Sequence, residues 1–199
     1  MGRYIGTLDF LQYSYGTFDI PDGTQKTLIV NAIANAETAI DNYTRRNFVG
    51  TTGTVYYSRF DEWRVRAGGA LYLHTDLIAP VEIQLGNSQN IPLGSIWLEP
   101  RDAGPPYRIV RLHSTYVWQW NTDQDMFISG TWGYSTAAPA DIEQATLRYA
   151  AYLYRQKDAA GYQDVAGFDQ AGQQTFVQGI PQDVRYILSV YRSRTGGAV

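Results

Sequence analysis

A strand-like segment that leads directly into a helix-like segment, residues 126–158, most constrains how this 199-residue chain folds. Residues 126–132 are rich in aromatic and β-branched side chains, which favour extended structure. Pro139 suits the first turn of a helix, because proline lacks the N–H group that this turn leaves unpaired. Asp141 and Glu143 then place negative charge near the positive end of the helix dipole. We therefore expect a β-strand followed closely by a helix.

Two long helices are predicted, over residues 24–47 and 139–158. In both, apolar side chains recur at steps of three and four residues, which places them on one face of an α-helix. The stripe of the first helix comprises Ile29, Ile33, Ala36, Ile40 and Tyr43. The second has a wider apolar face, so we expect it to be buried on more than one side. A short third helix follows Pro181, with an apolar face of Val184, Ile187, Leu188 and Tyr191.

Between the long helices, residues 49–132 change to the two-residue alternation of β-strands. Turn signals rich in glycine, proline and asparagine separate the segments. The predicted strands are residues 54–60, 70–75, 81–85, 95–98, 107–112 and 126–132. Short strands at this spacing predict an antiparallel sheet or a small barrel-like unit. The predicted fold class is α+β, a helical base of two long helices plus a short C-terminal helix, with an antiparallel β-rich unit inserted.

The chain divides into three parts on this interpretation. Residues 1–23 form an N-terminal arm, and residues 24–158 form the core. The core consists of helix 24–47, the β-rich insertion 49–132 and helix 139–158. Residues 159–199 combine a flexible segment, rich in glycine and glutamine, with the C-terminal helix.

Composition excludes several classes of protein. The net charge is −3, from 16 basic and 19 acidic residues, so the chain lacks the basic footprint of a nucleic-acid-binding domain. It has no cysteine, which rules out disulfides and thiolate metal sites. No apolar run approaches the roughly 18 residues of a membrane-spanning helix, and the N-terminus lacks a signal-peptide pattern. The 16 tyrosines suit half-buried subunit interfaces, or equally the strands of a β-rich domain.

The sequence contains no catalytic motif. Its two histidines, His74 and His113, each lie in or beside a predicted strand, and nothing places a nucleophile and a carboxylate with either. Nucleophile-elbow, zinc-protease and phosphate-loop patterns are absent. We therefore expect no enzymatic activity, no cofactor and no metal site.

Trp118 and Trp120 form a candidate aromatic row with Tyr116, because residues two apart on a strand face the same side. Such a row can bind a sugar or a protein partner, or it can pack in the core of a hairpin. We favour core packing and keep a carbohydrate-binding β module as an alternative function.

Four segments, in this order, resemble the head–tail connector proteins of tailed bacteriophages, also called adaptor or head-completion proteins. They are AIDNYTRRNF at residues 39–48, the strand and loop at residues 70–81, GPPYRIVRL at residues 104–112, and ISGTWGYS at residues 128–135. Pro139 and an acidic helix start follow the last of them. The resemblance spans residues 24–158, and both ends of the chain depart from the shorter members of that family.

The resemblance implies a structural virion protein that forms a ring, usually of twelve copies, at the portal vertex. Such a ring joins the portal protein to the tail, or to a stopper or tail-terminator protein. Double-stranded DNA passes through it without sequence-specific binding, and a weakly acidic lumen lets DNA slide because like charges repel. Such a protein is made in the host bacterial cytoplasm, has no membrane partner and ends in the neck of the virion.

Residues 159–199 are the segment that we expect to dock on the portal. Its tyrosines and arginines are the candidate contacts: Tyr186, Tyr191, Arg192 and Arg194. Removing residues 180–199 should then abolish portal binding and leave the helical base folded. A different neck or tail-completion protein, with the same ring but another partner, is the alternative within this class.

Overall fold

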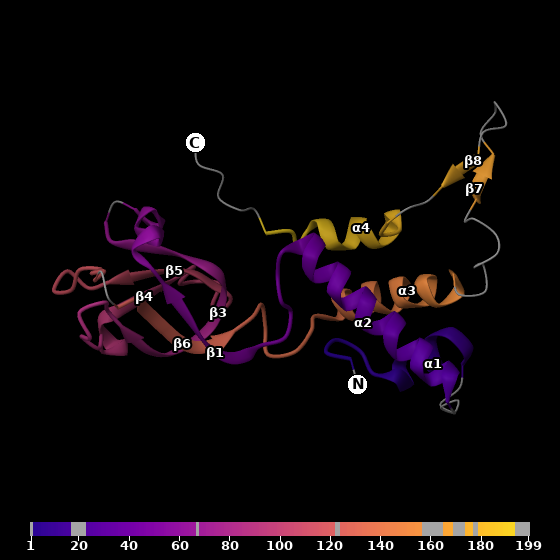
Figure 1. The fold of residues 1–199 in the computed structure, drawn as a ribbon, viewed down its shortest axis with the longest axis horizontal. Coiled ribbons are helices and arrows are strands. Elements are labelled where there is room, and N and C mark those ends of the chain that lie inside the picture. Colours follow the sequence, from indigo (N-terminus) through magenta and orange to yellow (C-terminus); the bar gives the residue numbers. More distant parts are fainter. Residues whose placement is uncertain are drawn as a thin grey trace. The chain divides into compact units, whose positions relative to one another are not determined.

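The computed structural model describes residues 2–16, 23–66, 68–121, 124–156, 165–168, 174–176 and 179–193. The chain forms two compact units, one of Met1–Arg45 with Ala138–Val199 and the other of Arg46–Ala137. The first is built mainly of helices and the second around an antiparallel sheet (Figure 1). The predicted α+β class is therefore confirmed.

The helical unit consists of α1 (Thr7–Tyr15), α2 (Thr24–Thr44), α3 (Ala140–Gln156) and α4 (Gln182–Ser189). The apolar stripe of α2 is its buried face, where Ile29, Ile33 and Ile40 are at most 2% exposed. α3 contacts each of the other three helices, and its Ile142 and Ala150 are fully buried. Three neighbours explain why α3 needs an apolar face wider than a single stripe.

α2 ends at Thr44 rather than at residue 47. Arg45 adopts a left-handed backbone conformation, with φ of 55°, and its N–H donates to the Asp41 carbonyl at 2.7 Å. A left-handed residue after the last turn is a common way for a helix to end.

The first residues of the chain contact α2 through hydrogen bonds and an ion pair. Tyr4 is 5% exposed, its backbone N–H donates to Glu37 Oε1 at 2.8 Å, and its hydroxyl donates to Asp41 Oδ1. Arg3 adds an ion pair with Asp41 at 2.8 Å. The residues before α1 are thus part of the helical unit.

The β unit holds a six-stranded antiparallel sheet in the order β1-β6-β3-β5-β4, with the short β2 paired to β3 (Figure 1). Its strands are β1 (Thr51–Tyr57), β2 (Val65–Arg66), β3 (Ala70–Gln84), β4 (Ile96–Glu99), β5 (Tyr107–Leu112) and β6 (Met126–Trp132). The 3₁₀ helix η2 (Leu93–Ser95) precedes β4. β5 and β6 have the predicted bounds, and every second residue of β6 is buried, which is the alternation that predicted it.

Two predicted strands, residues 70–75 and 81–85, are one continuous strand, so the turn expected at Pro80 is wrong. β3 pairs with β5 over its first half and with β6 over its second half, and register shifts flank Pro80. Proline cannot donate to the ladder, but at a bulge its missing N–H costs no regular hydrogen bond. Gly130 of β6 lies opposite Pro80 and allows the two backbones to approach closely.

The strand predicted over residues 54–60 ends earlier, because β1 stops at Tyr57 and the 3₁₀ helix η1 (Arg59–Arg64) follows. Asp61 Oδ2 accepts hydrogen bonds from both the backbone N–H and the hydroxyl of Ser58. This local capping competes with continuation of the strand.

Two short strands, β7 (Val165–Phe168) and β8 (Gln174–Phe176), form a separate antiparallel pair. They lie in the segment rich in glycine and glutamine that the sequence analysis assigned to a flexible loop, so the structure differs from that expectation here. Strands of three or four residues are too short for alternation to stand out in the sequence.

Candidate functional site

α4 buries one face and exposes the other. Val184 and Leu188 are fully buried where α4 packs on α2 and α3. Tyr186 and Val190 are 81% and 84% exposed, and they lie four residues apart on one side of the helix. An exposed aromatic side chain beside an exposed apolar one is typical of a surface that contacts another protein.

The sequence analysis proposed four portal contacts: Tyr186, Tyr191, Arg192 and Arg194. The Tyr191 hydroxyl donates to Asp141 Oδ2 at 3.1 Å, and the Arg192 guanidinium lies 5.7 Å from the centroid of the Tyr43 ring. Arg194 lies outside the described residues. The structure thus ties Tyr191 and Arg192 to the helical unit, whereas Tyr186 projects from it.

The buried face of α4 bears on the prediction that the helical base stays folded when residues 180–199 are removed. Removing residues 180–199 would take Val184 and Leu188 out of the core, and burial of each such side chain is worth about 1.5–3 kcal/mol. We therefore no longer expect the helical base to keep its stability without α4. Substitutions on the exposed face of α4 test docking more cleanly.

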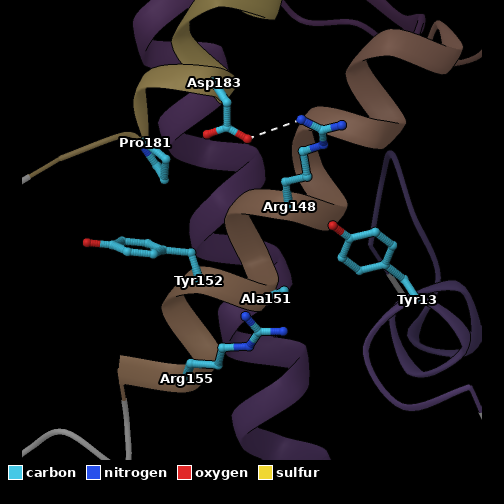
Figure 2. Close-up of a pocket in the computed structure, with 7 residues that line it drawn as sticks. All are labelled: Tyr13, Arg148, Ala151, Tyr152, Arg155, Pro181 and Asp183. Carbon is cyan, nitrogen blue, oxygen red and sulfur yellow. Dashed lines mark hydrogen bonds and ion pairs between the residues drawn. The ribbon is translucent and has the colours of Figure 1, made fainter.

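A groove of about 360 Å³ lies between α1, α3 and the start of α4 (Figure 2). It is lined by Tyr13, Arg148, Ala151, Tyr152, Arg155, Pro181 and Asp183. Arg148 Nη1 pairs with Asp183 Oδ2 at 3.1 Å, whereas Arg155 is exposed and has no ion pair within the described part of the chain. The groove therefore has aromatic walls and one positive charge without a counter-charge.

The sequence contained part of the signal for this groove. Arg148 and Arg155 are seven residues apart on a helix and so share a face. The approach of Tyr13 and Pro181 to that face depends on how α1 and α4 pack on α3, which no local pattern encodes.

In the β unit, two arginines hold a buried carboxylate. Arg46 Nη1 lies 2.7 Å from Asp76 Oδ2 and Arg108 Nε lies 3.2 Å from Asp76 Oδ1. The Arg46 guanidinium also lies 5.1 Å from the centroid of the Tyr134 ring, which packs against Phe48. Arg46 and Phe48, from one of the segments that carry the phage-connector resemblance, thus stabilise the β unit itself.

Trp118 and Trp120 do not lie on a strand, so the strand predicted for them is wrong, but they lie beside Tyr116 at one place on the β unit. Trp118 is 6% exposed and its indole N–H donates to the Gly69 carbonyl at 2.9 Å. Trp120 and Tyr116 are partly buried against the sheet core. These rings therefore pack against the sheet core, and Tyr116, Trp118 and Trp120 also line a pocket of about 580 Å³ in the β unit.

The histidines take part in packing. The His74 ring stacks on the buried Tyr57 ring, with centroids 4.8 Å apart, and burial lowers the pKa of His74. His113 packs edge-on against Trp97. Among the described residues, no group of three or more His, Cys, Asp or Glu side chains is arranged to hold a metal ion. In that same part of the chain, no helix combines the length and the apolar character that crossing a bilayer requires.

No family model and no curated protein matches the chain. Solved structures of gene transfer agent (GTA) particles contain chains with the same fold. A chain from the neck of an empty GTA particle, computed with C6 symmetry, is 16% identical with a TM-score of 0.62, and the match covers 99% of this chain and 94% of that chain.

Two further structures give similar values. A chain from the virion of a native GTA particle is 17% identical with a TM-score of 0.63, covering 97% of this chain and 92% of that one. A chain from the neck of a native GTA particle, computed with C12 symmetry, is 15% identical with a TM-score of 0.58. This match covers 96% of this chain and 92% of that chain. The chain therefore has the fold of chains in these phage-like particles over nearly its whole length, in line with the resemblance seen in the sequence.

Proposed function

We propose that this chain is a structural, non-catalytic protein of the neck of a phage-like virion. It forms a ring that joins the head to the tail and lets double-stranded DNA pass. The observation that carries this proposal is the fold shared with GTA neck chains, which covers at least 92% of each of them. Many folds serve unrelated functions, but here the match includes both units rather than one common module.

A ring of twelve copies is the proposed assembly. One of the similar necks is computed with C12 symmetry and another with C6 symmetry, and a ring of twelve copies is compatible with both. A cyclic ring requires each copy to present two different surfaces that complement each other head to tail. A net charge of −3 suits a channel protein, because DNA is then not held by electrostatic attraction.

The portal protein is the proposed partner on one side, and the tail or a stopper or tail-terminator protein is the partner on the other. We assign portal contact to the exposed face of α4, with Tyr186 at its centre and Arg194 beyond the helix. Tyr191 and Arg192 support this face through Asp141 and Tyr43. The protein is made in the host cytoplasm, needs no cofactor and ends in the virion neck.

Electron microscopy of the purified chain mixed with isolated portal tests the assembly, together with mass photometry of the chain alone. We expect a ring on the outer face of the portal. A chain that stays monomeric and never joins the portal, under conditions in which the tail proteins do join, would overturn the proposal.

The portal contact has its own test in a Tyr186→Ala substitution. Tyr186 is 81% exposed, so the fold should be unaffected, and loss of a central aromatic contact typically costs about 2 kcal/mol, roughly 30-fold in affinity. Tyr56→Ala is the matched control, because Tyr56 is 62% exposed but lies on the β unit. If both variants lost portal affinity equally, the proposal that the exposed face of α4 contacts the portal would be contradicted.

A further inference from the structure

The β unit contains a pocket of about 580 Å³, larger than the groove of the helical unit. Its lining residues come from η1, from β2 and the turn after it, and from residues 112–120, all within Arg46–Ala137. The volume lies within the roughly 300–1,000 Å³ of sites that enclose a small ligand. Neither the proposed portal contact on α4 nor the charged cluster around Asp76 includes any of these residues. The pocket is therefore available for a separate role.

Three aromatic rings line the pocket, and packing on the sheet holds them in place. Trp118 is 6% exposed, and its indole N–H donates to the Gly69 carbonyl at 2.9 Å. Tyr116 and Trp120 pack against the sheet core, and each keeps part of its surface exposed. Because these rings are already ordered, a flat apolar surface can stack on them with little loss of side-chain entropy.

The pocket also presents hydrogen-bonding groups that the chain itself does not use. In the part of the chain that the structure describes, the Glu62 carboxylate and the Ser114 hydroxyl are exposed and have no hydrogen-bond or ion-pair partner. The Trp120 indole N–H is buried and has no acceptor. The carboxylate only accepts, the indole only donates, and the hydroxyl does both. A ligand that satisfies this set must carry both donors and acceptors.

The charge at the pocket does not call for a charged ligand. Glu62 is the one charged side chain among the residues that line the pocket. Arg59, also exposed, lies three residues earlier on η1, and side chains three residues apart on a 3₁₀ helix share a face. The two charges offset each other, so the pocket suits a neutral ligand.

We propose that this pocket binds a neutral sugar ring of a glycan. The C–H face of a pyranose stacks on Tyr116 and Trp120, where the partly exposed rings line the pocket. Its hydroxyl groups donate to Glu62 and accept from the Trp120 N–H, because each hydroxyl does both. The inference adds a binding role for the β unit to the neck function and does not depend on a ring of subunits.

Other neutral ligands satisfy fewer of these groups. A proline-rich segment offers an apolar ring and a carbonyl acceptor for Trp120, but proline has no N–H to donate to Glu62. A purely apolar side chain offers neither a donor nor an acceptor and would leave the Trp120 N–H unpaired, which is unfavourable for a buried donor. A sugar combines an apolar face with donors and acceptors in one small body.

Nuclear magnetic resonance of the indole N–H groups tests the site. The full chain is titrated, up to tens of millimolar, with neutral hexoses, pentoses, deoxyhexoses, N-acetylhexosamines and their short oligosaccharides. We expect at least one sugar to shift the Trp120 signal, assigned with Trp120→Phe. The signals of Trp97 and Trp132, which lie outside the pocket, should stay in place.

Two substitutions locate the bound sugar. Glu62→Ala should weaken its affinity at least about tenfold, because a hydrogen bond to a charged group is lost. Asp102→Ala is the matched control, since Asp102 is an exposed carboxylate of the β unit outside the pocket. Trp120→Phe keeps an aromatic ring but lacks the N–H, and should also weaken binding. Glu62 is exposed, so circular dichroism should show an unchanged fold.

The outcomes separate this inference from the proposed function. A panel in which no sugar shifts the Trp120 signal would overturn it, and so would a sugar that binds Glu62→Ala as tightly as the parent. A proline-rich peptide that shifts the Trp120 signal where every sugar fails would replace the glycan with a protein segment. Joining of the chain to the portal is measured independently, so sugar binding by a chain that never joins the portal would overturn the neck function alone.

Discussion

Arg46 donates a 2.7 Å hydrogen bond to Asp76, thirty residues further along the chain, and the Asp76 side chain is only 2% exposed. A carboxylate at this depth has lost most of its hydration, so it depends on the cations that face it. Arg108 provides the second of these. The β unit therefore contains a charged cluster that joins the segment after α2 to the sheet.

Arg46→Met should destabilise the β unit by about 3 kcal/mol, the low end of the range for breaking a buried pair, because Arg108 still faces Asp76. Urea unfolding followed by tryptophan fluorescence measures this, since all five tryptophans lie within Arg46–Ala137. Adding Asp76→Leu to Arg46→Met should recover part of the loss, because no buried carboxylate is then left underpaired. A double variant less stable than Arg46→Met alone would contradict this account.

Gly130→Ala should destabilise the sheet by about 1–3 kcal/mol. A Cβ at Gly130 would clash with the Ala79 carbonyl oxygen, a backbone atom beside the Pro80 bulge that cannot easily move. Gly53 is the matched control, because it lies directly across the β1–β6 pair and a Cβ there would meet nothing within 4 Å. Gly53→Ala should change the unfolding free energy by no more than about 0.5 kcal/mol.

Stability of the β unit should fall as the pH drops below about 6.5, the ordinary pKa of histidine. Burial lowers the pKa of His74 in the folded chain, so below pH 6.5 the unfolded chain binds more protons and gains stability relative to the fold. Thermal unfolding of the parent and of His74→Gln between pH 7.5 and 5.5 isolates this contribution. A parent chain whose stability is no more sensitive to pH than that of His74→Gln would refute it.

Glu37→Leu should loosen the N-terminal residues from α2. Glu37 is 3% exposed and accepts the Tyr4 backbone N–H, and an unsatisfied buried donor costs about 1–3 kcal/mol. Hydrogen exchange of the Tyr4 amide and the melting of far-ultraviolet circular dichroism report the change. Thr38→Ala, at an exposed neighbouring position on α2, serves as the control and should leave both measurements near the parent values.

The elements predicted well from the sequence are those governed by local periodicity. The stripe of α2 and the alternation of β5 and β6 each reflect which side of one element is buried, and that information lies within a dozen residues. The exposure of Tyr186 follows in the same way from the apolar face of α4. The α+β class, and the order of helix, β-rich insertion and helix, came from these local patterns.

Tertiary structure decided the features that depend on distant partners. β3 continues through Pro80 because β5 pairs with one half and β6 with the other, and Gly130 makes room at the bulge. Asp76 is buried because Arg46 and Arg108 converge on it from separate segments. The sequence by itself indicated α2, α3, α4 and most strands, because each has a clear local period. It did not indicate α1, which lies in residues assigned to an arm, and the groove and the charged cluster exist only where packing brings remote side chains together.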